Sequence, residues 1–580
     1  MKLRVLVLLL VASTAFAEPI PDARRYDWTF TGVPGGIPNR TTVCATLGPG
    51  ATASQINSAI ASCSNGVVKL NAGTYNLTGI QLATSNVTLR GAGADQTILK
   101  GCAIMKLGNG NTFAHGAAVT AGGTKGSQTV TVSNVTGLSV GTMIEFDRND
   151  DSNIIKAGAG VGAGRYFRQI NRITAINGTT LTLQNPFLWD FTSAAGATIR
   201  FRFANVGLSG VEDLKLDHSG TSGCNDHNFD IQYCYGCWVK GVDSYKPSGY
   251  HMVIVATLNF EIRDSYIHDA ATYGANNGGV EVYGNGAFGS NSNAKIENNV
   301  FDRLFPAVNL QNSSSGFYIG YNYSYGSMAN ASGAPVTWTY LDNHGPHDMM
   351  NLWEGNIGEM FGSDGYFGGS SHGTAARNFF TGYNPNFGTR DDPIRLNRAS
   401  YYYSLVGNVL GSNEENPQKY NQTAENCTGG PAIYRLGYPN AGNCSFTDVT
   451  GHPIAGLTYP DLTVASTLFR WGNYDYSTRV NRFDPGEVPG GVPVPSDQLI
   501  PNSYYYSSKP AWFGNRPWPL IGPDVVGGDG DASGHVNKNP AQLCWESRNL
   551  KNGGSFNRDA CYGSGSGGGQ VPSALAGFNP

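Results

Sequence analysis

The sequence predicts an all-β protein, a right-handed parallel β-helix (a solenoid) with a small inserted β-subdomain and an N-terminal capping helix. Short β-type segments recur from residue 211 onward, and each ends in a small or amide residue. Only 14% of the residues are charged and 78 are glycine, which is typical of a turn-rich β protein. At 580 residues the chain exceeds the usual size of one domain. A solenoid escapes that limit because its core grows along one axis.

The recurring segments are VKGVDSY (239–245), IRDSYIH (262–268), IENNVFD (296–302), IGYNYSY (319–325), WEGNIGE (353–359), ARNFFTG (376–382) and VGNVLGS (406–412). Their shared position holds Val242, Ser265, Asn299, Asn322, Asn356, Asn378 and Asn408, at steps of 23, 34, 23, 34, 22 and 30 residues. A step near 22 residues fits one three-strand turn of a parallel coil, and longer steps indicate insertions on loops. Asparagines at one place in each coil can stack and hydrogen-bond along the axis.

The first part of the chain fits the same fold. ATASQINSAIASC (51–63) predicts a short helix because Ile56 and Ile60 are spaced i, i+4. Alternating strands follow in VVKLNAGTYNL (67–77) and VTLRGAG (87–93). A helix over the open end of a solenoid hides edge groups that would otherwise pair with another chain.

Two regions depart from the coil pattern. In residues 126–187 apolar and polar residues alternate, and the turns differ from those of the coils, for example at Asn177-Gly178. This pattern predicts an inserted β-subdomain at about 116–200. The β-helix that contains it is expected to span residues 18–470. After about 470 the asparagine rhythm stops and aromatics and prolines dominate, which indicates an irregular or β extension over 471–561. Residues 562–580 form a Gly/Ser-rich tail that we expect to be disordered.

The N-terminus, MKLRVLVLLLVASTAFA (1–17), predicts a secretory signal peptide. It has a basic start, an apolar run from Val5 to Val11, and small residues at Ala15 and Ala17. We expect cleavage after Ala17 and a secreted chain, extracellular or periplasmic, without a membrane span. A membrane anchor is the alternative, but the apolar run is too short for one.

Ten cysteines in an exported chain predict disulfides. Local pairs are expected between Cys44 and Cys63, Cys427 and Cys444, and Cys544 and Cys561, whereas the pairing of Cys102, Cys224, Cys234 and Cys237 stays open. The Cys234-x-x-Cys237 spacing is also a weak zinc or redox signal, although no second CxxC follows it. The net charge of −4 argues against nucleic acid as a partner.

Three stretches resemble the pectate lyase-like superfamily of right-handed parallel β-helix proteins. They are NGVVKLNAGTYNL (65–77), NVTLRGAGADQTIL (86–99) and coils of the type IENNVFDR (296–303). The resemblance covers about residues 40–470 and implies the fold. It leaves the activity open, because that superfamily holds lyases, hydrolases, epimerases and phage tailspikes on one scaffold.

A narrower similarity relates residues 353–408 to calcium-dependent pectate lyases. The order WEGN (353–356), Asp364-Gly365, RDDPIRLNR (390–398) and VGN (406–408) is similar to theirs, although Arg390 and Arg395 each stand one residue away from the family spacing around Pro393. The order found in polygalacturonases is not matched, because Ser371-His372-Gly373 precedes Asp391-Asp392.

β-Elimination from a uronate polymer needs a base for the C5 proton and neutralisation of the substrate carboxylate. From the resemblance and this chemistry we expect Arg390, His372 and Arg395 to be catalytic. The expected substrate-binding residues are Arg398, His344, His347, Trp353 and Tyr366. The expected metal ligands are Asp364, Asp391 and Asp392, with Ca²⁺ as the ion that oxygen ligands favour.

Each of these assignments has a structural alternative. The arginines could cap a coil by pairing with Asp391 and Asp392, and Asp364 could be a turn residue. The histidines could be hydrogen-bonded loop residues, and the aromatic side chains could belong to a ladder inside the helix.

The leading functional hypothesis is a secreted carbohydrate-active protein, a polysaccharide lyase that cleaves an acidic (uronate) glycan by β-elimination. One alternative is a glycoside hydrolase with two carboxylates drawn from Asp342, Asp348, Glu354, Asp364, Asp391 and Asp392. The other is a non-catalytic glycan-binding surface protein or adhesin. The expected partner is a polysaccharide, acidic for a lyase, and the chain is expected to be a monomer.

Overall fold

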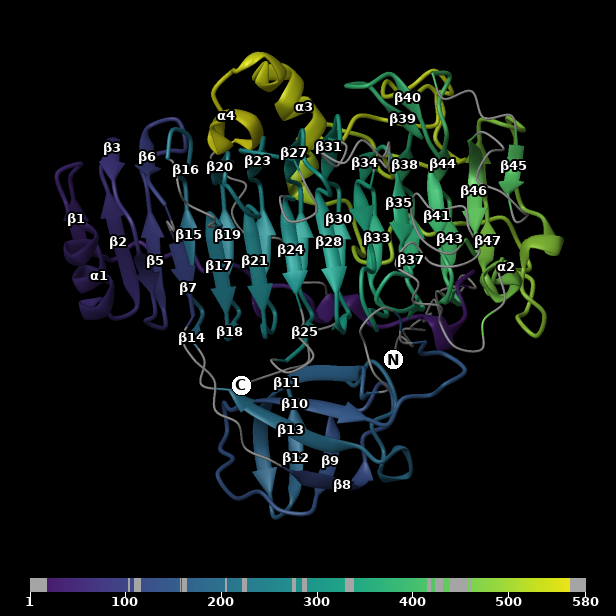
Figure 1. Cartoon of the computed structure of the whole chain (residues 1–580), viewed down its shortest axis with the longest axis horizontal. Coiled ribbons are helices and arrows are strands. Elements are labelled where there is room, and N and C mark those ends of the chain that lie inside the picture. Colours follow the sequence, from purple (N-terminus) through teal and green to yellow (C-terminus); the bar gives the residue numbers. More distant parts are fainter. Residues whose placement is uncertain are drawn as a thin grey trace, which may run out of the picture.

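The computed structural model describes residues 18–563, with gaps at 103–104, 109–115, 157, 159–163, 204–205, 222–226, 274–277, 284–288, 329–337, 415–418, 423–430, 439–456 and 458–459. The body of the molecule is a right-handed parallel β-helix whose axis is horizontal in Figure 1. Three long sheets, called here A, B and C, run along this axis, and successive strands of the chain enter them in turn. This confirms the fold class that the sequence predicts.

Sheet A contains β1 (Val43–Leu47), β2 (Gly66–Leu70), β5 (Val87–Arg90), β15 (Gly210–Glu212), β19 (Trp238–Lys240), β22 (Glu261–Arg263), β26 (Lys295–Glu297), β30 (Tyr318–Gly320), β33 (Leu352–Glu354), β37 (Thr374–Ala376), β43 (Ser404–Val406) and β47 (Phe469–Trp471). Sheet B contains β3 (Gly73–Asn76), β6 (Thr97–Lys100), β16 (Lys215–Asp217), β20 (Asp243–Tyr245), β23 (Tyr266–His268), β27 (Val300–Asp302), β31 (Tyr323–Tyr325), β34 (Ile357–Gly358), β38 (Phe379–Phe380), β44 (Val409–Leu410), β48 (Asn473–Asp475) and the antiparallel β49 (Asn481–Arg482).

Sheet C contains β4 (Ile80–Leu82), β7 (Met105–Leu107), β17 (Phe229–Gln232), β21 (Met252–Val255), β24 (Val280–Tyr283), β28 (Val308–Gln311), β32 (Tyr340–Leu341), β35 (Phe361–Ser363), β41 (Ile394–Leu396), β46 (Ala432–Leu436) and β45 (Lys419–Gln422). Short parallel pairs lie between sheets C and A: β14 (Val206–Gly207) with β18 (Cys234–Tyr235), β25 (Asn291–Ser292) with β29 (Ser314–Ser315), and β36 (Ser370–Ser371) with β42 (Ser400–Tyr401). A hairpin of β39 (Tyr383–Asn384) and β40 (Thr389–Arg390) follows sheet B.

The predicted asparagine ladder lies at the turn between sheets A and B. The backbone N–H and the side-chain amide of Asn322 both donate to Oδ1 of Asn356, each at 3.0 Å. Asn356 donates in the same way to Asn378, at 2.9 and 3.0 Å, and Asn378 to Asn408. All these amides are buried, so each rung satisfies polar groups that the coil would otherwise leave without a partner.

The ladder is longer than the sequence pattern indicates. Both N–H groups of Asn408 donate to Oδ1 of Asn473, at 2.9 Å, so the last rung lies beyond residue 470, where the rhythm was expected to stop. The expectation was wrong because 65 residues separate these two rungs, about twice the longest earlier step. At the other end Ser265 replaces asparagine and accepts from Val242 N at 3.2 Å.

The predicted capping helix is α1 (Ala53–Ser62), beside β1 at the first coil. Thr52 and Gln55 form a capping box at its N-terminus, and Ile56 and Ile60 are its buried residues. The helix therefore buries one apolar face on the end of the solenoid and leaves its polar face in water.

The inserted subdomain is a closed six-stranded barrel of β8 (Ala117–Gly122), β9 (Thr129–Val132), β10 (Met143–Arg148), β11 (Phe167–Asn177), β12 (Thr180–Leu183) and β13 (Thr198–Phe203). Figure 1 shows it below the solenoid, next to β14, β18 and β25. The N–H of Ile170 in β11 donates to Ser292 Oγ in β25 at 3.0 Å. The barrel thus covers the short strands between sheets C and A.

The segment after β49 returns along the outside of the solenoid and ends in α3 (Pro540–Ser547) and α4 (Arg558–Tyr562). The remaining helical pieces are α2 (Leu462–Thr467) and 3₁₀ turns at Asp22–Arg24, Trp28–Phe30, Ser193–Ala195, Pro485–Glu487, Ala511–Phe513 and Leu550–Asn552. Arg377 pairs with Asp524 at 2.8 Å, and Asn539 donates to Tyr321 O at 3.1 Å. These contacts hold the segment on the coils.

Two expected disulfides are present, Cys44–Cys63 and Cys544–Cys561. Cys234 and Cys237 also pair, which replaces the zinc interpretation of that motif, and Cys102 is disulfide-bonded as well. The expected Cys427–Cys444 pair, Cys224 and the signal peptide lie outside the described residues, as do residues 564–580. In the parts of the chain that are described, no helix has the length and apolar character needed to cross a membrane.

Candidate functional site

The structure separates the expected site residues into several places. Arg390 lies exposed on the β39–β40 hairpin, at the top of Figure 1, on the side away from the barrel. Trp353 lies inside the solenoid with no exposed surface, and its Nε1 donates to Asp342 Oδ1 at 2.6 Å. It points inward because it alternates with outward-facing neighbours on β33. Trp353 is therefore a core residue and offers no surface to a sugar.

The Arg395 group is an ion network on the outer side of sheet C. Arg395 contacts Asp391 and lies 2.8 Å from Asp392 Oδ2, and Arg435 Nε lies 2.5 Å from the same oxygen. Burial alone would raise the pKa of Asp392, but Arg395 and Arg435 hold it below the usual value. Arg398 is fully buried, and its Nε donates to Gly365 O at 3.0 Å. Arg395 supports the structural alternative, because its charge is paired with Asp391 and Asp392, and Arg398 is buried on a backbone carbonyl.

The expected calcium ligands do not fit a divalent cation. The carboxylates of Asp391 and Asp392 already face guanidinium groups, and Asp364 binds a histidine. Among the residues that the structure describes, no three His, Cys, Asp or Glu side chains are grouped so as to hold a metal ion.

We expect removal of calcium to have no effect on this protein. Because Arg395 and Arg435 already pair with the Asp391 and Asp392 carboxylates, calcium would have to displace these guanidinium groups to bind there. Dialysis against EDTA should leave the melting temperature and any glycan-cleaving rate unchanged, with calcium-repleted protein as the control. A fall in either quantity that added calcium restores would contradict this expectation.

His347 and His372 pack against the barrel. The ring of His347 meets the edge of Phe167 at 5.4 Å, and that of His372 lies 4.9 Å from Trp189. His347 is fully buried, and burial lowers its pKa to about 3. For His372, burial and then the charges of Arg24, His347 and Lys125 hold the pKa well below the usual value. The inserted barrel therefore covers the face on which these histidines were expected to meet substrate.

Docking of the barrel should weaken as the pH falls. Both histidines have a folded pKa below the ordinary value of 6.5, so the folded state disfavours their protonation. Their contribution to stability is complete above about pH 6.5 and is lost progressively below it. Thermal melting at about pH 7.5 and pH 5 checks this, with the double variant His347→Gln/His372→Gln expected to show a smaller drop than the wild type. Equal drops would contradict it.

His344 and Asp364 form a close pair at the end of sheet C. Nδ1 of His344 lies 2.5 Å from Asp364 Oδ2, and the His344 side chain is 32% exposed. Burial disfavours the imidazolium, but Asp364, with help from Glu281, outweighs this and raises the pKa of His344. The partly exposed ring of Tyr366 stacks beside the imidazole at 6.0 Å. Of the expected residues, these three are brought together with one ring edge open.

Glu281 is a site residue that the sequence reasoning missed. It lies on β24 between the core residues Val280 and Val282, so its side chain points outward from sheet C. Its carboxylate accepts from Asn309 at 2.8 Å and from Gln311, both on the next strand. Burial raises the pKa of Glu281 to about 7, although His344 and the two amides oppose this.

The sequence carries one signal for Glu281. VEVY (280–283) places a charged residue within an alternating apolar strand, and VNLQ (308–311) places two amides at the same face of another. In chain order these segments are distant from His344 and Asp364. In sheet C, β28 lies between the strand of Glu281 and β32, which leads to His344, and the charges of His344 and Asp364 both act on the pKa of Glu281.

The other carboxylates of the hydrolase alternative are enclosed. Burial raises the pKa of Asp342 to about 7, and this group accepts from Trp353 and Tyr403 inside the solenoid. Glu354 is also buried with a pKa raised to about 7, and it accepts from Ser503. Asp348 is fully buried, and burial raises its pKa well above the usual range.

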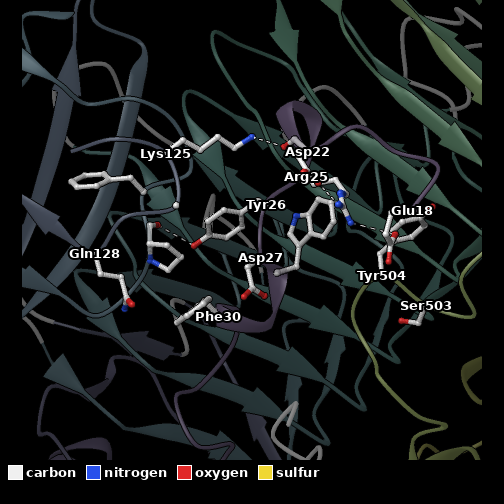
Figure 2. A pocket seen from close by; sticks show the side chains of 14 residues that line it. Glu18, Asp22, Arg25, Tyr26, Asp27, Phe30, Lys125, Gln128, Ser503 and Tyr504 are labelled. Carbon is white, nitrogen blue, oxygen red and sulfur yellow. Dashed lines mark hydrogen bonds and ion pairs between the residues drawn. The ribbon is translucent and has the colours of Figure 1, made fainter. Parts of the chain in front are cut away.

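A cavity of 490 Å³ lies where the N-terminal segment, the barrel and the C-terminal segment meet (Figure 2). The charged side chains around this cavity are engaged in ion pairs and hydrogen bonds. Arg25 pairs with Glu18 at 3.3 Å and with Asp22, and Lys125 Nζ donates to the backbone carbonyls of Asp22 and Ala23. Burial lowers the pKa of Lys125 to about 8. These contacts tie the N-terminal segment to the barrel.

Solved structures with a similar architecture were found. The tailspike of Pseudomonas phage phi297 is 14% identical, with a TM-score of 0.40 over 66% of this chain and 72% of the tailspike. The A-module of a mannuronan C-5 epimerase from Azotobacter vinelandii is 14% identical, with a TM-score of 0.37 over 73% and 81%. A polygalacturonase from Erwinia carotovora ssp. carotovora is 13% identical, with a TM-score of 0.31 over 69% and 94%.

No protein-family model matches the sequence, and no curated protein sequence is significantly similar to it. The fold assignment rests on the strand pairing of this chain itself, in which three parallel sheets share one axis.

Proposed function

We propose that this protein is a carbohydrate-active enzyme, a polysaccharide lyase that cleaves an acidic (uronate) glycan by β-elimination. The observation that supports this best is that Glu281, which is 2% exposed, lies on the outer face of sheet C within electrostatic range of the His344–Asp364 pair, whose imidazole is partly exposed. A carboxyl group that holds its proton near neutral pH and an imidazole of raised basicity are the acid and the base that this reaction needs.

In the proposed reaction Nε2 of neutral His344 takes the proton on C5 of a uronate residue. The electron pair of that C–H bond forms the C4–C5 double bond, and the C4–O bond breaks. Glu281 gives its proton to the departing oxygen. Exchange with water then restores both groups. Asp364 holds the imidazole through Nδ1 and stabilises the imidazolium that forms.

The substrate carboxylate must be neutralised for its C5 proton to become acidic. Asn309 and Gln311 each use one amide N–H on Glu281, and each amide has a second N–H to donate. We assign to these two uncharged side chains the donation of hydrogen bonds to the substrate carboxylate, which stabilises the negative charge that builds up there as the C5 proton leaves.

The positions of His344, Asp364 and Glu281 favour β-elimination over a hydrolase mechanism, which would use two carboxylates. A hydrolase needs a second carboxylate that is free to meet water or the sugar. Asp364 is the carboxylate coupled to Glu281, and both of its oxygens are engaged, Oδ2 with His344 and Oδ1 with the Tyr366 N–H at 3.0 Å. His344 is therefore the group of the cluster that is placed to take a proton.

The proposal is tested by incubating the purified chain with polygalacturonate, alginate, glucuronan and neutral glycans, and by following ultraviolet absorbance and reducing ends together. A lyase produces both signals, because the new double bond absorbs. An increase in reducing ends without an increase in absorbance would show that the enzyme is a hydrolase and not a lyase. If neither absorbance nor reducing ends increase with any glycan, the protein is better assigned as a non-catalytic glycan-binding protein.

Activity should follow a bell-shaped dependence on pH with its maximum near neutrality. Removal of the proton needs neutral His344, whose pKa is raised above 6.5, so the rate falls on the acid side. Donation of a proton needs protonated Glu281, whose pKa is about 7, so the rate falls on the alkaline side. Measuring kcat/KM between about pH 5 and pH 9 checks this. A plateau that continues above pH 8 would contradict the role of Glu281 as the acid.

We also propose that the chain is exported, cut after Ala17 and active as a monomer. The pairs Cys44–Cys63 and Cys544–Cys561 support export, because such bonds persist in oxidising compartments. Mass spectrometry of protein recovered outside the cell should show Glu18 as the first residue, and light scattering should give the mass of one chain. A retained leader or a larger assembly would overturn these assignments.

A further inference from the structure

The N-terminal segment, residues 20–40, runs along the solenoid from its last coil to its first coils, in purple in Figure 1. At one end Ile20 is buried in an apolar cluster with Trp471, and at the other Arg40 donates to Thr88 Oγ1 at 3.0 Å. The hydrogen bonds between these ends are Arg24 Nη1 to Thr467 O at 2.8 Å, Trp28 Nε1 to Met350 O at 2.7 Å, Gly32 N to Asn293 O at 2.9 Å and Val33 N to Glu261 Oε2 at 3.2 Å. The partners of the segment therefore follow the coils in the reverse order of the chain.

These partners are in place only on assembled coils. Met350 and Asn293 lie at turns directly before β33 and β26, and their backbone carbonyls accept from the segment. The side-chain amide of Asn259, a residue that is 1% exposed, donates to Phe30 O at 2.6 Å and to Gly32 O at 3.0 Å. A chain whose turns have not yet formed does not present these groups in a row.

The same segment is bonded to the barrel. The Tyr26 hydroxyl donates to Pro186 O of the barrel at 3.4 Å and accepts from Asn293 Nδ2 of the solenoid at 2.8 Å (Figure 2). Lys125 Nζ, between β8 and β9 of the barrel, donates to Ala23 O at 2.8 Å. The segment therefore joins the barrel to the coils.

The bonds of this segment span much longer stretches of chain than the bonds of the coils. Neighbouring coils contact one another directly, so a solenoid can form coil by coil. In contrast, Val33 and Glu261 are 228 positions apart, and Arg24 and Thr467 are 443 positions apart. Closing loops of this length costs more conformational entropy than closing one coil of about 22 residues. The coils are therefore expected to form before the segment binds to them.

We propose that residues 20–40 are a strap that closes on the finished solenoid as the last step of folding and locks the barrel against the coils. Arg24 is the polar anchor at the last coil, because it is 5% exposed and donates to the carbonyls of Tyr403 and Thr467. Burial lowers the pKa of Arg24 to about 10, so the anchor stays charged at neutral pH. In the native protein the strap leaves before the coils open, and its departure frees the barrel. The strap is independent of the reaction proposed for Glu281.

Pulse-labelling hydrogen exchange during refolding of the disulfide-bonded chain tests the order of closure. The amides of Gly32 and Val33 in the strap are expected to become protected at least about tenfold more slowly than those of β22 and β26, because the strap closes the longer loops. Protection of the strap together with these strands, or before them, would overturn the inference.

A second experiment needs no refolding. A protease site after Gly35, which is exposed and has no described residue within 4 Å of an added Cβ, allows the strap to be cut in the native protein. Gel filtration in urea below the unfolding midpoint should then remove residues 18–35. The Ile170 amide donates to Ser292 Oγ between barrel and solenoid, and its protection should fall by about tenfold, as expected for the loss of one or two hydrogen bonds. A synthetic peptide of residues 18–35 should restore it.

The matched control is the same protease site after Gly491, an exposed glycine of the C-terminal segment with equally open surroundings among the described residues. Cutting there should leave the protection of Ile170 unchanged. The inference is overturned if the cut strap leaves only when the coils unfold, or if Ile170 keeps its full protection without the strap. Equal losses of protection after the two cuts would also overturn it. None of these outcomes depends on whether Glu281 is catalytic.

Discussion

Replacing Glu281 by glutamine is expected to lower kcat for glycan cleavage by about 10²–10⁴-fold, the usual range for loss of a general acid. Glutamine keeps the size of the side chain and one of the two hydrogen bonds accepted from Asn309 and Gln311, but it has no acidic proton to give to the departing oxygen. The rate of increase in ultraviolet absorbance, on the polymer that the wild type cleaves, measures the effect.

The control for this prediction is Glu212→Gln. Glu212 is also a buried, outward-facing glutamate of the solenoid, but it lies on β15 of sheet A and pairs with Arg90 at 2.7 Å. This variant should keep the wild-type rate, and both variants should retain the wild-type circular dichroism spectrum. A Glu281→Gln enzyme within about threefold of the wild-type rate would remove Glu281 from the mechanism.

Replacing Asn356 by alanine is expected to destabilise the solenoid by about 3–5 kcal/mol, among the largest effects of single substitutions. Asn356 Oδ1 accepts from two N–H groups of Asn322, and its amide donates to Asn378 Oδ1 and to Ile319 O. Alanine removes the acceptor of both Asn322 N–H groups and the side-chain donor to Ile319 O, while Asn378 Oδ1 keeps only the backbone N–H of residue 356. Each buried group left without a partner costs about 1–3 kcal/mol. The midpoint of urea unfolding, compared with the wild type at equal slope, measures the loss.

Two further variants make this prediction specific. Ser265→Ala removes two hydrogen bonds at the end of the ladder, the one accepted from Val242 N and the one donated to Arg263 O, and should cost about 2 kcal/mol. Asn76→Ala changes an exposed asparagine of β3 and should stay within about 0.5 kcal/mol of the wild type. If Asn356→Ala unfolds at the same midpoint as Asn76→Ala, the ladder contributes nothing to stability.

The coils could be predicted because their signals are local and periodic. One amide recurs at one place in each turn, and alternate apolar residues must face the core. The capping helix is similarly local, since Thr52, Gln55, Ile56 and Ile60 lie within three turns of helix. Asn473 was missed because 65 residues intervene after Asn408, so the period could no longer be followed.

The site could be predicted only in part. His344, Asp364 and Tyr366 were named from one stretch of chain, and the structure does bring them together. Arg390, Arg395 and Trp353 were named for their residue types, yet they lie on a hairpin, in an ion network and in the core. Residue type alone does not tell which charges the surrounding coils already neutralise.

By itself, the sequence determined the parallel β-helix, its capping helix and its asparagine ladder, since each depends on contacts between residues at regular spacing. It also indicated an inserted β-subdomain, whose closure into a barrel only the structure shows. Only the tertiary structure decided which outward side chains meet. Glu281 on β24 comes within electrostatic range of His344 because β28, whose Leu310 carbonyl accepts from the His344 N–H, lies next to β24 in sheet C. His347 and His372 are covered because the barrel packs on that face, and no local pattern encodes the face on which an insertion packs.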